Sequence, residues 1–334
     1  MDSANSNVNV REHSIHAGIL AINHGVPERV QTAEELAPLI GMSPQWIREH
    51  AGVCRRHISS LGEDPAALAA SIAKPIVERF GEPDLILHAG AMERQLLPDM
   101  SVFIARELGL SRIPGFTINA TCLSFLVALQ TATALVRDGS HRRVLICSSE
   151  FGTHGRNFKE PESAALIGDA AAVALIGITS DASGILHYAM ETWPEGAELA
   201  EVRGMGVMRP PNDKRTNDED NLFHMQGDRM LRFIVPKLQR FISSFLADCR
   251  LTLNDIDLVV PHQTSAAGMR VLDRLGFPKH KVVNILADYG NCVAASIPMA
   301  LSIAEHAGRI KRGDQVLLIG TAAGLSIGAA LIRW

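Results

Sequence analysis

The sequence predicts an α/β protein whose two similar halves pack as five layers, α/β/α/β/α. The first observation is a repeated unit of apolar strand, loop, second strand, helix and third strand, which begins at residues 83–92 and again at 256–265. The second is one further small-residue strand after each unit, at residues 168–177 and 327–334. The third is that these strands are apolar on both faces, as in sheets that helices cover on both sides.

The elements of the first unit follow from its residue patterns. Residues 83–92 open with apolar side chains and predict a strand that leads into a loop. FTINA predicts the second strand, which ends in a turn, and the Ala- and Leu-rich run after Cys122 predicts a helix. RRVLICSSE predicts the third strand, and GDAAAVALIG predicts the small-residue strand that follows it.

The second unit repeats this order. Its strands are expected in IDLVVP, at the start of VVNILADYGN and in DQVLLIG, and its helix in the Ala-rich run after Asn291. We therefore divide the chain into a polar tail (1–12), an N-terminal half (13–178) and a C-terminal half (179–334). Residues 192–221 carry turn formers and scattered charges, which predicts a loop excursion. This excursion either shapes a substrate entrance or forms a solvated flap.

Composition and charge exclude several classes of protein. The chain has 334 residues, 47% of them hydrophobic and 20% charged, which indicates a globular protein and neither a disordered chain nor a coiled coil. A net charge of −4 leaves no basic excess for nucleic acid. No apolar run of the sequence reaches the roughly 20 residues that cross a bilayer. The first residues lack the pattern of a signal peptide, so we expect a cytoplasmic protein.

Three residues are candidates for one chemical site. Five cysteines without a C-x-x-C pair argue against disulfides and a zinc site, but Cys122 lies at a helix start, where backbone N–H groups favour a thiolate. His262 follows an apolar strand and Asn291 precedes a helix. The structural alternatives are a buried core thiol, a hydrogen-bonded loop histidine and a helix-capping asparagine. Because the repeat puts all three at strand ends, they could share a site suited to thioester chemistry.

Along nearly its whole length the chain resembles the ketoacyl-acyl-carrier-protein synthase III family of the thiolase fold. The resemblance rests, in this order and spacing, on WIREHAGVCRRHI, ATCLSF, LIGDAAAVALI, VPHQ, YGNCVAASIPMAL and GAALIRW. It implies a thiolase-like duplicated α/β/α/β/α fold and an acyltransferase activity. The family condenses an enzyme-bound acyl group with a malonyl thioester, with loss of CO2, in the synthesis of fatty acids or of specialised lipids and polyketides.

Carried over to this sequence, the resemblance makes Cys122 the nucleophile that accepts the acyl group from an acyl-CoA or an acyl-carrier protein. His262 and Asn291 become the pair that binds the second thioester. The backbone N–H groups of Cys122 and Ala323 become the oxyanion hole. Coenzyme A takes part as a thioester substrate, and we expect no other cofactor and no metal.

The resemblance also implies substrate contacts and partners. Trp46 would stack on the adenine of coenzyme A, and Arg56, in the same stretch of sequence, is expected to contact the substrate. Leu97 would limit the acyl pocket from across a homodimer. Apolar residues of segment 91–103 predict a surface that such a dimer buries: Met92, Leu96, Leu97, Met100 and Phe103. Acyl-carrier protein is a further expected partner.

The chain departs from the family pattern at six positions, which are His50, Ser124, Ser265, Ala267, Ala322 and Ala323. These changes spare the three candidate residues and alter the donor-docking surface and the pocket wall, so a housekeeping role and a specialised role both stay open. One alternative is an acyltransferase or non-decarboxylative relative that acts on a 3-ketoacyl, hydroxyl or amine acceptor. Glu93 could be a base in such a variant, and is otherwise an exposed loop carboxylate. A noncatalytic partner subunit is the second alternative.

Overall fold

The computed structural model describes residues 16–334, so the polar tail expected at residues 1–12 lies outside the described residues. The first half of the chain forms a sheet of five strands in the order β1-β7-β6-β4-β5. Strands β6, β4 and β5 run parallel to one another, β7 pairs antiparallel with β6, and β1 pairs antiparallel with β7. The strands are β1 (Ala17–Gly25), β4 (Leu85–Ala89), β5 (Gly115–Ile118), β6 (Arg143–Glu150) and β7 (Ala170–Ile178).

The second half forms a four-stranded sheet in the order β11-β12-β13-β8. Strands β11 and β12 are parallel, and β13 and β8 are antiparallel to their neighbours. Its strands are β8 (Gly184–Thr192), β11 (Leu258–Pro261), β12 (Gln315–Ala322) and β13 (Ser326–Arg333). The second sheet therefore reproduces the order β1-β7-β6-β4 of the first with strands β8, β13, β12 and β11. This agreement confirms the predicted repeat.

The strand expected at the start of VVNILADYGN is wrong, because only one bridge forms there, between Val259 and Val282. The side chain of Gln263 takes the place of further strand pairing. Its Nε2 donates to the carbonyl oxygens of Pro261 (2.9 Å) and Val283 (3.1 Å), and its Oε1 accepts from the backbone N–H of Ile285 (2.9 Å). The chain then turns into α9 (Leu286–Tyr289) instead of continuing as an edge strand.

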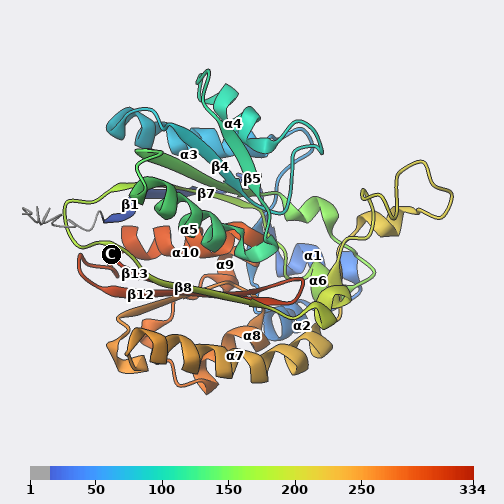
Figure 1. The fold of residues 1–334 in the computed structure, drawn as a ribbon. Helices are drawn as coiled ribbons and strands as arrows, with labels where there is room; N and C mark the ends of the chain where they lie inside the picture. Colours follow the sequence, from blue (N-terminus) through green and yellow to red (C-terminus); the bar gives the residue numbers. More distant parts are fainter. Residues whose placement is uncertain (1–15) are drawn as a thin grey trace, which may run out of the picture.

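Helices fill the three remaining layers (Figure 1). Helices α5 (Ser124–Arg137) and α10 (Ser296–His306) lie between the two sheets, and most of their residues are buried there. Helices α3 (Pro65–Phe80) and α4 (Met100–Glu107) cover the outer face of the first sheet, and α7 (Gly227–Cys249) and α8 (Ala266–Arg274) cover that of the second. The five-layered thiolase-like fold is thus confirmed.

The two central helices begin in the same way. A 3-10 turn precedes each of them, Thr121–Leu123 before α5 and Val293–Ala295 before α10. The first residue of each helix, Ser124 or Ser296, accepts through its Oγ a backbone N–H bond from the residue four positions earlier, at 3.0 Å in both cases. A buried hydroxyl in this place satisfies a backbone donor that the turn leaves unpaired.

Smaller elements complete the structure. Strands β2 (Val30–Thr32) and β3 (Arg55–His57) pair with each other, as do β9 (Ala200–Glu201) and β10 (His224–Met225). Short helices are α1 (Ala33–Ile40), α2 (Pro44–Trp46) and α6 (Pro161–Ala164). The excursion expected at residues 192–221 is largely loop and protrudes from the body of the molecule (Figure 1). Within the described residues no helix has the length and apolarity needed to cross a membrane.

Candidate active site

A cavity of about 610 Å³ opens where the ends of β5, β11 and β12 meet. Cys122, His262, Asn291 and Ala323 all line it, although they come from four different segments of the chain. The carboxyl ends of parallel strands are the usual place for a ligand in a sheet covered by helices. The structure therefore brings together the residues that the repeat placed at strand ends.

Cys122 is held in the 3-10 turn between β5 and α5 by a constrained backbone. Thr121, the residue before it, has a φ of +51°, which a β-branched residue rarely adopts. Two hydrogen bonds fix this conformation: the N–H of Thr121 donates to Asn119 Oδ1 (3.0 Å), and its hydroxyl donates to the carbonyl oxygen of Ala323 (3.4 Å). The turn thereby couples the position of the thiol to the turn after β12.

The electrostatic setting of Cys122 differs from the one expected at a helix start. Burial and, as a smaller effect, the nearby carboxyl of Glu150 together raise the pKa of its thiol to about 12, against the lowering effect of a backbone hydrogen bond. Loss of hydration therefore outweighs the helix N-terminus in this site. The resting residue is a thiol, and its proton must leave as it attacks a substrate.

His262 lies directly after β11, and its backbone N–H donates to Ile319 on β12 (2.8 Å). Gly320 allows this approach, because a Cβ there would lie 2.9 Å from the Cβ of His262 and 3.0 Å from Leu123. Burial lowers the pKa of His262 to about 4, so the imidazole is neutral at neutral pH. Its Nδ1 has no hydrogen-bond partner in the part of the chain that the structure describes. A neutral imidazole with the proton on Nε2 can donate one hydrogen bond into the cavity.

Asn291 caps a turn and also lines the cavity, so the two interpretations that the sequence left open do not exclude each other. Its Oδ1 accepts a hydrogen bond from the backbone N–H of Val293 (2.9 Å), which caps the turn before α10. Its backbone is fixed by bonds to Leu166 (2.8 Å) and Gly168 (3.0 Å). Because the oxygen is engaged by the turn, the amide orientation is set and Nδ2 is left as the donor of this side chain. Asn291 can therefore cap the turn through Oδ1 and still offer Nδ2 as a hydrogen-bond donor.

Three further residues with expected substrate contacts do not line this cavity. Trp46 stacks on the ring of His50, with centroids 4.7 Å apart. Leu97 is 82% exposed. Arg56 is fully buried and donates through Nη1 to the carbonyl oxygens of Ala164 (3.2 Å), Ala165 (2.6 Å) and Ile167 (3.4 Å). This packing favours a structural role for Arg56, because a fully buried side chain cannot contact a substrate in this conformation.

Two expectations for segment 91–103 are wrong. Met100 and Phe103 are not surface residues, because they pack as part of α4 against α3 and the first sheet. Glu93 is not an exposed loop carboxylate, because its side chain turns inward and approaches Nδ1 of His88 at 3.4 Å, with Oε2 buried. Leu96 and Leu97 do remain exposed.

Sequence reasoning missed Glu150, which lies buried at the end of β6. Its carboxyl accepts the backbone N–H groups of Ala91 (2.8 Å) and Met92 (3.0 Å), two residues that line the cavity. Burial raises the pKa of Glu150 to about 8, and the carboxyl of Glu93 adds to this effect. The signal in the sequence was a carboxylate at the end of an apolar strand, the same placement that singled out His262.

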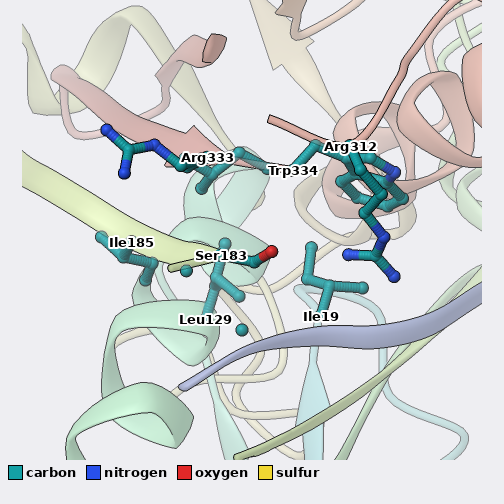
Figure 2. Close-up of a pocket in the computed structure, with 10 residues that line it drawn as sticks. Ile19, Leu129, Ser183, Ile185, Arg312, Arg333 and Trp334 are labelled. Atoms are coloured by element: carbon teal, nitrogen blue, oxygen red, sulfur yellow. The ribbon is translucent and has the colours of Figure 1, made fainter. Parts of the chain in front are cut away.

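A second hollow, of about 10 Å³, lies between β1, β8 and the end of the chain (Figure 2). It has room for about one water molecule. Residues such as Ile19, Leu129 and Trp334 line it, and Cys122 is not among its lining residues. We assign no chemistry to it.

Comparison with known proteins identifies the chain. Family models for 3-oxoacyl-[acyl-carrier-protein] synthase III match residues 116–194, and those for its C-terminal part match residues 246–334. The beta-ketoacyl-[acyl-carrier-protein] synthase III of Rickettsia bellii is 30% identical over 92% of this chain and 96% of its own length. This chain belongs to the synthase III family. The enzyme of that name from Fusobacterium nucleatum is 29% identical over 95% of this chain and 98% of its own.

Solved structures agree with the family. The synthase III of Aquifex aeolicus superposes with a TM-score of 0.86 at 26% identity, over 95% of this chain and all of its own. The priming beta-ketosynthase of the R1128 polyketide pathway also reaches 0.86 at 26% identity, over 96% of both chains. As a synthase III homologue the chain is an acyl-thioester condensing enzyme of the acyltransferase class. The comparisons favour neither a noncatalytic subunit nor a transferase to hydroxyl or amine acceptors.

Proposed function

We propose that this synthase III homologue loads an acyl group from an acyl thioester onto Cys122 and then extends it by two carbons from a malonyl thioester. The observation that supports this most is the convergence of Cys122, His262 and Asn291 on one cavity. A nucleophile and two hydrogen-bond donors are what the two half-reactions require.

In the first half-reaction the sulfur of Cys122 attacks the carbonyl carbon of the acyl thioester. The carbonyl electrons move to oxygen, and the backbone N–H groups of Cys122 and Ala323 are proposed to hold the resulting oxyanion. The C–S bond to coenzyme A then breaks, and the proton of the Cys122 thiol ends on the departing sulfur. The raised pKa of Cys122 fits this route, because no free thiolate needs to accumulate.

In the second half-reaction a malonyl thioester loses CO2, and the electrons of the broken C–C bond become an enolate. His262 Nε2 and Asn291 Nδ2 are proposed to donate to the enolate oxygen. The enolate carbon attacks the carbonyl carbon of the acyl-enzyme, and the C–S bond to Cys122 breaks to release a 3-ketoacyl thioester. The electron pair of that bond goes to the sulfur, which regains its proton from water. The neutral state of His262 suits this role, because its pKa of about 4 keeps an imidazole donor without a net charge.

The partners are part of the proposal. We propose a homodimer, for which the exposed Leu96 and Leu97 of one chain are the supporting observation. An acyl-carrier protein as the bearer of the malonyl group, Trp46 as a contact for coenzyme A, Leu97 as a limit of the acyl pocket and a cytoplasmic location stay predictions. So does the expectation that no further cofactor takes part.

The test separates the two half-reactions. The protein is incubated with a panel of acyl-CoAs from C2 to C16, and the adduct is located by peptide mass. 14C-labelled malonyl thioester then reports CO2 release and the 3-ketoacyl product. We expect an adduct on Cys122 and condensation from it. An adduct mainly on another cysteine, or none with any donor, would contradict the proposal.

A further inference from the structure

The cavity extends away from Cys122 into the layer between the second sheet and its outer helices. Six aliphatic residues line this extension, which we name the aliphatic chamber: Ile234, Val235 and Leu238 of α7, Val271 and Leu272 of α8, and Ile319 of β12. All but Val235 are buried members of the core between the second sheet and its helices. The chamber is thus an opening in an apolar core, and not a groove on the surface.

Such an opening is unusual for a protein interior. Cores pack about as densely as organic crystals, with few voids larger than a water molecule. A void lined only by aliphatic groups gives water no hydrogen-bond partners and stays dry, so it favours an apolar occupant. The whole cavity, of which the chamber is one part, has a volume of about 610 Å³, which lies in the range of small-molecule sites.

The cavity that contains the chamber is long. Gly227 and Leu238 both line this cavity and lie eleven positions apart on α7, which corresponds to a helical rise of about 16 Å. An acetyl group on Cys122 would leave most of this length empty. The occupant that fits is an unbranched alkyl chain, because the walls at the α7–α8 end carry no charged side chain and no hydroxyl group.

We propose that the aliphatic chamber binds the alkyl chain of the acyl group carried by Cys122, so that the enzyme selects medium- and long-chain acyl thioesters. This inference rests on the proposed function, because it takes Cys122 as the acyl carrier. It moves the control of chain length from Leu97, which is exposed and outside the cavity, to Leu238 of α7 and Leu272 of α8, which both line the cavity.

The first experiment measures acylation of Cys122 by acetyl-CoA and by dodecanoyl-CoA in single turnovers, followed by intact mass. Leu238→Trp and Leu272→Trp narrow the chamber from opposite helices. In both variants the ratio of the dodecanoyl rate to the acetyl rate should fall, by about fourfold for each methylene group that can no longer be buried in the chamber. Gln239→Trp is the matched control, because Gln239 is the next residue of α7 and is exposed. Its ratio should stay within twofold of the unaltered protein.

Thermal unfolding of each variant shows whether a lower ratio of the dodecanoyl rate to the acetyl rate reflects misfolding. Val235→Phe is a second variant in the same wall of the chamber, with a smaller aromatic side chain than tryptophan. Ratios that stay unchanged in both Trp variants would overturn the chamber as the acyl site. A ratio that falls only in Leu97→Phe would place the limit at Leu97 instead. No adduct on Cys122 with any donor in the unaltered protein would contradict the proposed function and not the chamber.

A second measurement tests the chamber without chemistry at sulfur. Dodecanoyl-CoA is titrated calorimetrically into Cys122→Ala and into the double variant Cys122→Ala/Leu238→Trp. Burial of the alkyl chain should give a negative heat-capacity change that shrinks in the double variant. Equal affinity and equal heat-capacity change in the two proteins would overturn the inference.

Discussion

Asn119 and Asn291 occupy equivalent places in the two halves of the molecule. The Oδ1 of each accepts a hydrogen bond from the backbone N–H two residues further on, at 3.0 Å from Thr121 and at 2.9 Å from Val293. Both bonded residues have a positive φ, +51° and +47°. The duplicated turn thus positions the thiol of Cys122 in the first half and the amide of Asn291 in the second.

This equivalence gives a matched pair of variants. Asn119→Ala and Asn291→Ala each remove one cap, so each should lower the free energy of unfolding by about 1 kcal/mol in a urea titration. Only Asn291→Ala should lose CO2 release from malonyl thioester, by about 10² to 10³-fold, because only Asn291 is proposed to donate to the enolate. Equal CO2 release in the two variants would show that Asn291 only caps the turn and does not donate to the enolate.

Acylation should be confined to Cys122. Cys147 and Cys292 are buried, and burial raises the pKa of both thiols, but neither of them lines the cavity. Peptide mass after incubation with octanoyl-CoA should place the adduct on Cys122 and show none in Cys122→Ala. Cys292→Ala is the control and should retain the adduct. An adduct that persists in Cys122→Ala would point to a different nucleophile.

His262 should make stability fall in acid. Between pH 6.5 and about 4 the unfolded chain binds a proton at this histidine that the native protein does not, because burial lowers its native pKa to about 4. The loss should approach about 3 kcal/mol over this range and be absent above pH 7. Denaturant unfolding of the unaltered protein and of His262→Gln at pH 4.5 and 7.5 isolates the effect. An equal acid loss in both proteins would show that His262 is not responsible.

Glu150 should make the protein less stable as the pH rises, which is the opposite of the effect of His262. Burial raises its native pKa to about 8, so its contribution to stability is present below pH 4.5 and is lost as the pH rises through 8. The unaltered protein should therefore lose stability relative to Glu150→Gln between pH 5 and 9. Removal of this charge should also lower the pKa of Cys122 and speed acylation at pH 9, by up to about tenfold for one pKa unit. Glu93→Gln, which removes the neighbouring carboxylate, should show a smaller change.

The proposed dimer can be tested at the exposed pair Leu96 and Leu97. Light scattering at micromolar concentration should give twice the chain mass for the unaltered protein and one chain mass for Leu97→Asp, because the charge would be buried in an apolar interface. Leu61→Asp is the control, since Leu61 is exposed and lies in a different segment. A monomeric unaltered protein would contradict the dimer.

Residue patterns predicted most of the fold because apolar strands and Ala-rich helices repeat in the same order in both halves. The second sheet lacks a partner for the β5 position because the amide of Gln263 satisfies backbone groups of residues 283 and 285, a side-chain contact that no periodicity reveals. Met100 and Phe103 were misplaced for a related reason. Their burial depends on α4 packing against α3, which lies some thirty residues earlier in the chain.

The site was predictable as a set of residues but not as an electrostatic environment. Strand ends located Cys122, His262 and Asn291. The protonated state of Cys122 was not foreseen, because it depends on the loss of hydration at the thiol and on the charge of Glu150, which lies at the end of another strand. The same limit applies to Glu93, whose inward turn follows from its approach to His88.

Gln263 has a consequence for self-association. An uncovered strand at the edge of a sheet offers its backbone groups to the strand of another molecule, which is a route to aggregation. Here a single amide covers part of the edge beside β11 from within the same chain, with one bond to Val283 and one from Ile285. Replacement by a smaller side chain would leave these groups without a partner. Because Val283 and Ile285 are buried, another molecule could pair with them only after this segment opens, so the loss of Gln263 should lower stability and, through such opening, raise the rate of aggregation on storage.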